Sequence, residues 1–314
     1  MATATASAQA VVRKPQPKEN IFRRIVRYKH AYAMIGITVI LLAIFNYYPS
    51  FMGLFRAFFN YDIGLKPEFI GLGNFIKLFT VDSTFIGSLG NVVLFTAWRT
   101  ISALIFPFIA AELIFGLTNP RHKFIYRLAM IVPIVVPGMV YILLWQFIYD
   151  GTSGLLNALL KAVGLVDWQR AWLGNPKTAL WAVTLMGFPW VGGVNVLIYL
   201  AGLTGITNEI IDSAKCDGCT GFRRIWYIDI PLIRGQFKLL IVLSVLGGLQ
   251  GWGTMFVMTR GGPGTSTMVP GLWLYNNAFQ WNKMGYASAI GMFMFLIIMG
   301  ITIINMKFIR TADQ

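Results

Sequence analysis

Residues 208–231 read NEIIDSAKCDGCTGFRRIWYIDIP, a polar segment between two long apolar stretches. By itself the segment predicts a short helix with Asn208 as its N-cap, because acidic residues that favour the helix dipole follow in the first turn. Gly218 ends or bends this helix, and Pro231 restarts the chain toward the next apolar stretch. The segment is therefore a structured connection between two stretches that are each long enough to cross a bilayer.

The composition is typical of an integral membrane protein. Of its 314 residues, 56% are hydrophobic and 12% are charged, and the mean hydropathy is +0.65. A soluble domain carries about 25% charged residues, so a bilayer must solvate part of this apolar surface. The net charge of +14 does not indicate nucleic-acid binding, because the basic residues separate apolar stretches and do not gather on one face. Membrane lipid is the expected partner, and nucleic acid is not.

Hydropathy predicts an all-α, multi-pass protein with about six transmembrane helices, near residues 32–58, 84–116, 124–149, 178–203, 236–259 and 285–306. The second stretch is too long for one perpendicular crossing, so it is tilted or extends past the membrane. The first is a retained span, because its apolar run is longer than that of a cleaved signal peptide. These spans predict a basic tail, a six-span membrane domain and a short C-terminal tail, at residues 1–31, 32–310 and 311–314.

Positive charge predicts the orientation of these spans. With the N-terminus inside, the cytosolic segments hold 17 of the 26 Lys and Arg residues and the outer segments hold 8. Both termini and residues 208–231 are therefore expected in the cytosol. Residues 18–29 form either a basic amphipathic helix on the inner leaflet or a disordered tail. Short helices along the outer interface are expected in three outer segments, 59–83, 150–177 and 260–284.

No catalytic or metal-binding set can be assembled from the sequence. Cys216 and Cys219 form a Cys-x-x-Cys pair, but a second pair is missing, and His30 and His122 are the only histidines. Two small residues packed on a short helix are therefore a better interpretation than a redox or zinc site. Neither a Ser-His-Asp set nor paired carboxylates within a span can be found. We expect no catalytic residue, no metal and no enzyme activity in this chain.

Residues 208–231 resemble the EAA motif of permease subunits in binding-protein-dependent ABC importers. That motif joins an acid and two small residues to a glycine four positions on, and ends in Ile-x-x-Pro. The matching residues are Asp212-Ser213-Ala214, Asp217-Gly218 and Ile228-x-x-Pro231. The departures are conservative, with Asp212 for the usual Glu, Ser213 for the first Ala, and Cys219 where Ala is common.

The resemblance implies the ABC type I importer permease fold and a coupling helix that docks on an ATPase subunit. The residues it places at that contact are Glu209, Asp212, Ser213, Ala214, Asp217, Gly218, Ile228 and Pro231. The chain has no Gly-x-x-x-x-Gly-Lys-Ser/Thr phosphate loop, so ATP and Mg are expected in a separate cytosolic ATPase dimer and no cofactor in this chain. A second homologous permease and an extracytoplasmic substrate-binding protein are the other implied partners. The alternative interpretation of the segment is a self-contained cytosolic turn.

The chain also resembles the sugar-importer branch of this family, the group similar to the larger maltose permease subunit. It rests on Gly261-Gly262-Pro263, Tyr275-Asn-Asn-Ala-Phe279 and Gly285-Tyr-Ala-Ser-Ala-Ile290, and on Pro133, Pro137 and Gly187-Phe-Pro189 in earlier spans. Transporter sites lie near the bilayer midplane, at helices that proline or glycine interrupts. Spans three to five carry such residues, although close helix packing is an alternative reason for each glycine.

The positions that match sugar-contacting segments of the maltose-type subunit are Met186, Gly187, Trp190, Ser244, Gly248, Gln250, Gly251 and Trp252. Among them Trp190 is the first candidate, because sugars stack on aromatic rings. Glycine stands at 248 and 251 where that subunit has Asn, so this half either grips the solute or only shapes its path.

Arg99 is the one charge deep within a predicted span. An intramembrane charge is by default functional and faces the bundle interior. We expect Arg99 to contact an acidic group on the sugar or to pair with the partner permease. Glu112 lies roughly three to four turns further along the same helix, too far to reach it.

The predicted function is a permease subunit for a sugar or oligosaccharide in the bacterial cytoplasmic membrane. The alternative is an ion-coupled secondary transporter of a small polar solute, which needs ionisable groups at mid-membrane. Glu112 is the only acid that a span offers for that role. A membrane enzyme is a third and weaker candidate.

Overall fold

The computed structural model describes residues 27–308. Contacts divide the chain into two compact units, residues 1–52 and 53–314, and each is described by itself. The predicted tail 1–31 with its interfacial helix lies almost wholly outside the described residues, as does the tail 311–314.

The described part of the first unit is helical throughout. α2 (Lys29–Leu42) continues through a π-helical turn, η1 (Ala43–Tyr47), into α3 (Tyr48–Arg56), which crosses the boundary between the units. The 28 residues from Lys29 to Arg56 are long and apolar enough to cross a membrane. None of the residues in α2 is buried, as expected for a helix that lipid surrounds.

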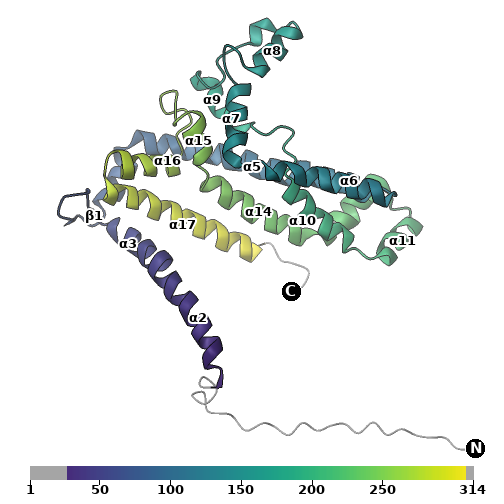
Figure 1. Ribbon diagram of the computed structural model, residues 1–314, viewed down its shortest axis with the longest axis horizontal. Coiled ribbons are helices and arrows are strands. Elements are labelled where there is room, and N and C mark those ends of the chain that lie inside the picture. Colours follow the sequence, from purple (N-terminus) through teal and green to yellow (C-terminus); the bar gives the residue numbers. More distant parts are fainter. Residues whose placement is uncertain (1–26, 309–314) are drawn as a thin grey trace, which may run out of the picture. The chain divides into compact units, whose positions relative to one another are not determined.

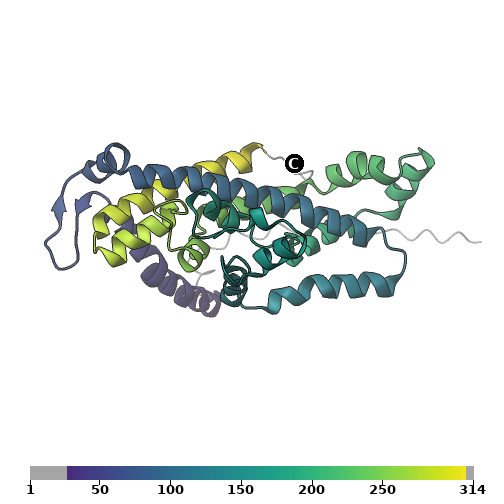
Figure 2. The same cartoon turned by 90° about the horizontal axis from the view of Figure 1, so that it is seen from above.

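The second unit is built around one long helix, α5 (Ser83–Phe115), which α10 (Gly193–Thr204) and α14 (Arg234–Leu249) flank (Figure 1, Figure 2). Asp82 caps α5, because its side chain accepts a hydrogen bond from Phe85 N at 2.8 Å. The 33 residues of α5 give a length of about 50 Å, more than the hydrocarbon core requires. This length agrees with the prediction that the second span is tilted or extends past the membrane.

Three of the predicted spans are interrupted. The third consists of α6 (Pro120–Ile131), a 3₁₀ turn, η2 (Val132–Val135), and α7 (Gly138–Ile148), with a bend of 88°. The fourth is divided into α9 (Pro176–Thr184) and α10, and the fifth into α14 and α15 (Gly253–Met258). These breaks fall at the proline and glycine residues that spans three to five were predicted to carry.

The sixth predicted span is the continuous helix α17 (Met284–Phe308). By length and composition, three described helices can cross a membrane, and three bent pairs raise the number to as many as six. The remaining elements are short: β1 (Phe59–Asn60), β2 (Glu68–Phe69), α4 (Gly73–Thr80), α8 (Leu155–Ala162), η3 (Val166–Trp168), α11 (Asn208–Cys216), α12 (Gly221–Arg224), η4 (Ile225–Asp229), α13 (Ile230–Leu232), α16 (Pro270–Tyr275) and η5 (Asn276–Gln280). β1 and β2 pair antiparallel, with Phe59 opposite Phe69.

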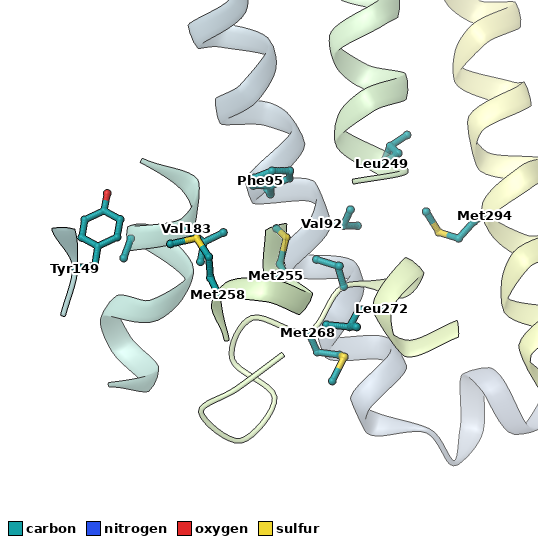
Figure 3. Close-up of a cluster of buried hydrophobic side chains, with 12 residues drawn as sticks. Val92, Phe95, Tyr149, Val183, Leu249, Met255, Met258, Met268, Leu272 and Met294 are labelled. Atoms are coloured by element: carbon teal, nitrogen blue, oxygen red, sulfur yellow. The ribbon is translucent and has the colours of Figure 1, made fainter. Parts of the chain in front are cut away.

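Methionine-rich packing fills the core where α5, α9, α14, α15, α16 and α17 meet (Figure 3). Met255 is fully buried, and Met258, Met268 and Met294 complete the cluster around Val92 of α5. Methionine suits this place because an unbranched side chain fills the irregular gaps between helices that cross at different angles.

Large apolar side chains are exposed along α6, η2 and α7. Phe124, Val135 and Phe147 are 67%, 81% and 60% exposed, respectively. So large an apolar surface is unfavourable in water and suits lipid or a second protein. The fold is therefore that of an all-α, multi-pass membrane protein.

Candidate functional site

A cavity of about 400 Å³ lies where the interrupted helices meet α5. Its volume falls in the usual range for small-molecule sites. The lining residues come from α5, α7, α9, α10, α14, α15 and the break between α9 and α10: Phe95, Trp98, Arg99, Ser102, Ala103, Tyr141, Val183, Thr184, Met186, Gly187, Trp190, Val191, Gly192, Asn195, Leu240, Leu243, Ser244 and Thr254. Five of the predicted pathway residues are thus brought together: Arg99, Met186, Gly187, Trp190 and Ser244.

A tight turn in the break between α9 and α10 places Trp190 at the cavity. Gly187 has φ +94° and Trp190 has φ +57°, and Trp190 N donates to Gly187 O at 2.7 Å. A side chain at position 187 would overlap the Tyr141 hydroxyl, so glycine is required there for two reasons.

Aromatic rings hold the Trp190 indole from three sides. Its ring centroid lies 5.1 Å from that of Trp98, 5.0 Å from Phe106 and 5.0 Å from Phe188. Its Nε1 donates to Leu185 O at 3.1 Å, so the polar edge is satisfied within the turn. Trp190 is therefore a fixed aromatic wall of the cavity.

Pro107 interrupts the hydrogen bonding of α5 beside the cavity. Because proline has no N–H, the carbonyl of Ala103, four residues earlier, loses its helical donor. Asn195 of α10 replaces that donor, since its Nδ2 lies 3.3 Å from Ala103 O. A side-chain amide thus joins α10 to α5 at a point where the helix cannot satisfy its own backbone.

Four other predicted pathway residues lie outside the cavity lining. Gln250 is exposed at the C-cap of α14. The Trp252 ring stacks on Tyr275, with centroids 4.9 Å apart and planes at 23°. A Cβ on Gly248 would lie 2.7 Å from Thr96 Oγ1, and one on Gly251 would lie 2.7 Å from a carbonyl oxygen of the preceding turn. Both glycines therefore allow close packing.

Replacing Gly248 with alanine is expected to destabilise the protein by about 1–3 kcal/mol, because the added methyl group meets the Thr96 backbone at 2.9 Å. The measurement is the thermal unfolding midpoint of the purified protein in detergent. Gly253→Ala is the matched control, since no atom lies within 4 Å of a Cβ there. Equal midpoints for the two variants would contradict the packing role.

The 208–231 segment begins with α11. The predicted cap at Asn208 is wrong by one residue: Thr207 is the N-cap, with an extended ψ of 151°, and Ile211 N donates to Thr207 O at 3.3 Å. Asn208 already has a helical backbone, so the first closed turn includes it.

Gly218 ends α11 as predicted. Its φ is +71°, its N donates to Lys215 O at 3.0 Å, and Cys219 N donates to Ala214 O at 2.7 Å. This pair of bonds is a Schellman motif, which fixes how the chain leaves the helix. The chain then continues through α12, the π-helical turn η4 and α13, in which Pro231 is the second residue.

Most of the residues that the EAA resemblance singles out form an exposed surface. Asp212 pairs with Lys215 at 2.8 Å, with both side chains exposed. Ala214 is buried, Ile228 and Pro231 are half-buried, and the exposed members are Glu209, Asp212, Ser213, Asp217 and Gly218.

Arg224 ties the segment to the C-terminal end of α5. Its Nε donates to Asp229 Oδ2 at 2.9 Å, and its Nη2 lies 3.6 Å from Glu112 Oε2. The Asp229 side chain is fully buried and that of Glu112 is 8% exposed. The Arg224 guanidinium also lies 5.5 Å from the centre of the Phe115 ring. One arginine therefore compensates two buried carboxylates from distant parts of the sequence.

Residues 103–311 match the family described as the inner membrane component of binding-protein-dependent transport systems. The chain belongs to this family. It is 30% identical to the probable ABC transporter permease protein YesP of Bacillus subtilis, over 88% of the chain and 89% of that relative. It is 25% identical to MsmF, a permease protein of a multiple sugar-binding transport system in Streptococcus mutans, over 91% of the chain and 97% of that relative.

The structure of this permease is also similar to a solved importer. That structure is of a bacterial alginate ABC transporter in complex with an alginate pentasaccharide-bound periplasmic protein. The TM-score is 0.79 and the identity is 23%, over 91% of this chain and 96% of the other. The predicted resemblance to sugar-importer permeases and the predicted fold are confirmed.

The sequence did not predict several residues of the cavity and of the 208–231 segment. Trp98, Tyr141 and Asn195 line the cavity, but each lies on an apolar helix with no motif around it. Phe222, Trp226 and Tyr227 form an exposed aromatic group in the 208–231 segment, where only the charges drew attention. Among the described residues no group of three or more His, Cys, Asp or Glu could hold a metal ion.

Proposed function

We propose that this permease forms half of the translocation pathway of an ATP-driven importer for a sugar or oligosaccharide in the bacterial cytoplasmic membrane. A second homologous permease forms the other half. A cytosolic ATPase dimer binds ATP and Mg, and an extracytoplasmic binding protein delivers the saccharide. The relative that serves a multiple sugar-binding system supports the solute class.

The observation that carries the proposal is the cavity at three interrupted helices. Its wall combines the rings of Trp98, Trp190 and Tyr141 with the uncharged polar groups of Ser244 and Asn195. Aromatic faces with a few hydrogen-bonding groups are the usual wall of a small-molecule site, and interrupted helices are the usual frame of a transporter site.

The contacts of Arg224 support coupling through the 208–231 segment. The exposed helix α11 offers a surface to an ATPase, while Arg224 joins the same segment to Glu112 of α5. Because α5 also carries Trp98 and Arg99 in the cavity wall, a displacement of the segment has a continuous structural connection to the pathway.

The alternative, ion-coupled transport, requires an acid that faces the pathway. Glu112, the span acid that sequence reasoning offered, lies against Arg224 and not among the cavity lining. The described lining residues include no carboxylate. These placements favour ATP-driven transport.

Gly218→Val tests the coupling role. A β-branched residue at φ +71° is strained by about 1–2 kcal/mol, so the exit from α11 is expected to change. We expect normal membrane insertion, but loss of ATPase co-purification and of solute-stimulated ATP hydrolysis. Gly218→Asn is the matched control, because asparagine tolerates this backbone conformation.

Unchanged co-purification and unchanged stimulated hydrolysis in Gly218→Val would remove the coupling role from this segment. The proposed function as a whole is tested in proteoliposomes that contain both permeases, the ATPase and the binding protein. Saccharide uptake is expected only with ATP on the ATPase side. Uptake driven by a pH gradient without the ATPase would establish the ion-coupled alternative.

A further inference from the structure

Arg99 is the only charged residue among the described residues that line the cavity. It is residue 17 of the 33 in α5, midway along a helix long enough to cross the membrane. Its side chain is exposed, so the guanidinium is open to the cavity. A fixed positive charge at this depth is unfavourable unless an anion or water compensates it.

No acidic partner compensates Arg99 within residues 27–308. The three ion pairs found there join Lys215 to Asp212 and Arg224 to both Glu112 and Asp229. Gly247 of α14 leaves space beside the guanidinium, since a Cβ there would lie 3.2 Å from Arg99 Nη2. The fold therefore accommodates the head group of Arg99 without neutralising it.

Residues beside Arg99 carry further polar groups. Trp98 Nε1 and Thr184 Oγ1 belong to lining residues, are buried, and have no hydrogen-bond partner among the described atoms. Gly192, which also lines the cavity, is the N-cap of the 12-residue helix α10. The N-terminal end of a helix carries a partial positive charge and free N–H groups. The wall of the cavity thus carries the charge of Arg99 and a partial positive charge at the N-terminal end of α10.

We infer that the transported solute is an anionic saccharide, whose carboxylate, sulfate or phosphate group pairs with Arg99. A guanidinium binds such groups through two parallel, charge-assisted hydrogen bonds. A neutral sugar offers the guanidinium hydrogen-bond acceptors but no negative charge to pair with. The inference rests on the proposed function and specifies the solute class of that same cavity.

The first test is the charge of the solute. Mass spectrometry of the saccharide that co-purifies with the importer's own binding protein is expected to show a carboxylate, sulfate or phosphate. A neutral saccharide would overturn the inference and leave the proposed importer intact.

The second test is the role of Arg99. In proteoliposomes with the complete importer, Arg99→Gln is expected to slow uptake of that solute by about tenfold or more, because a charge-assisted bond is lost. Arg99→Lys keeps the charge and is expected to retain most of the uptake. Arg121→Gln is the control for loss of an exposed positive charge outside the cavity.

Defined probes complete the test. The detergent-purified wild-type importer is expected to bind trigalacturonate more tightly than neutral galactotriose, and Arg99→Gln is expected to lose this preference. Equal uptake in wild type and Arg99→Gln overturns the inference. So does an Arg99→Gln variant that no longer co-purifies with the second permease but keeps its solute preference, because Arg99 then pairs with that subunit. Absence of ATP-dependent saccharide uptake by the wild type is a different failure, that of the proposed function.

Discussion

Replacing Arg224 with glutamine is expected to lower the thermal unfolding midpoint by several degrees. Within residues 27–308, the change removes the cation that pairs with Asp229 and Glu112, two carboxylates with side-chain exposures of 0% and 8%. Breaking a buried ion pair by removal of one partner costs about 3–5 kcal/mol, and each kcal/mol corresponds to about 2–4 °C in a chain of 150–250 residues. Thermal unfolding of the purified protein in detergent is the measurement.

Two variants make the result for Arg224 specific. Arg223→Gln removes the neighbouring exposed arginine and is expected to leave the midpoint unchanged. The double variant Arg224→Gln/Asp229→Asn removes one of the stranded charges and is expected to recover part of the loss. If Arg224→Gln and Arg223→Gln unfold at the same temperature, the contacts of Arg224 with Asp229 and Glu112 do not stabilise the fold.

Replacing Gly193 with alanine is expected to separate α10 from α6. A Cβ at this position would overlap the carbonyl oxygen of Met130 and lie 2.8 Å from its carbonyl carbon. Both are backbone atoms, so no side chain can rotate away and the helices themselves must move. Overpacking of this kind costs about 1–3 kcal/mol and more where the backbone must shift. Reduced stability and reduced uptake are expected together, because Gly193 directly follows the break that forms the cavity wall.

Gly90→Ala is the matched control for Gly193. Gly90 lies within α5, and no atom is found within 4 Å of a Cβ there. Alanine has the higher helix propensity, so this variant is expected to be neutral or slightly more stable. A Gly193→Ala protein with wild-type stability would show that α10 and α6 do not pack as closely as described.

Local signals in the sequence were sufficient for the spans, their interruptions and the end of α11. Hydropathy marks a span within about 20 residues, and glycine or proline marks a break at a single residue. Gly218 is an example, since its positive φ is required by the turn itself. Hydropathy alone did not locate the breaks in the fourth and fifth spans, because apolar residues continue across them.

These local signals could not predict contacts between segments that are distant in the sequence. Arg224 and Glu112 are more than 100 positions apart, and their pairing follows from how α5 meets the 208–231 segment. Among the predicted pathway residues, Arg99 and Trp190 line the cavity, but Gln250 and Trp252 lie beyond its wall. Helical spacing predicts which side chains share one face of a helix. It does not predict which other helix packs against that face.

Pro107 removes one backbone hydrogen bond of α5 between Arg99 and Glu112. With one hydrogen bond fewer, the helix is easier to bend at this turn than elsewhere along its length. The side-chain amide of Asn195 in α10 donates a hydrogen bond to the free carbonyl of Ala103. This contact therefore stabilises α5 where its own backbone bonding is incomplete, between Arg99 at the cavity and Glu112 beside Arg224.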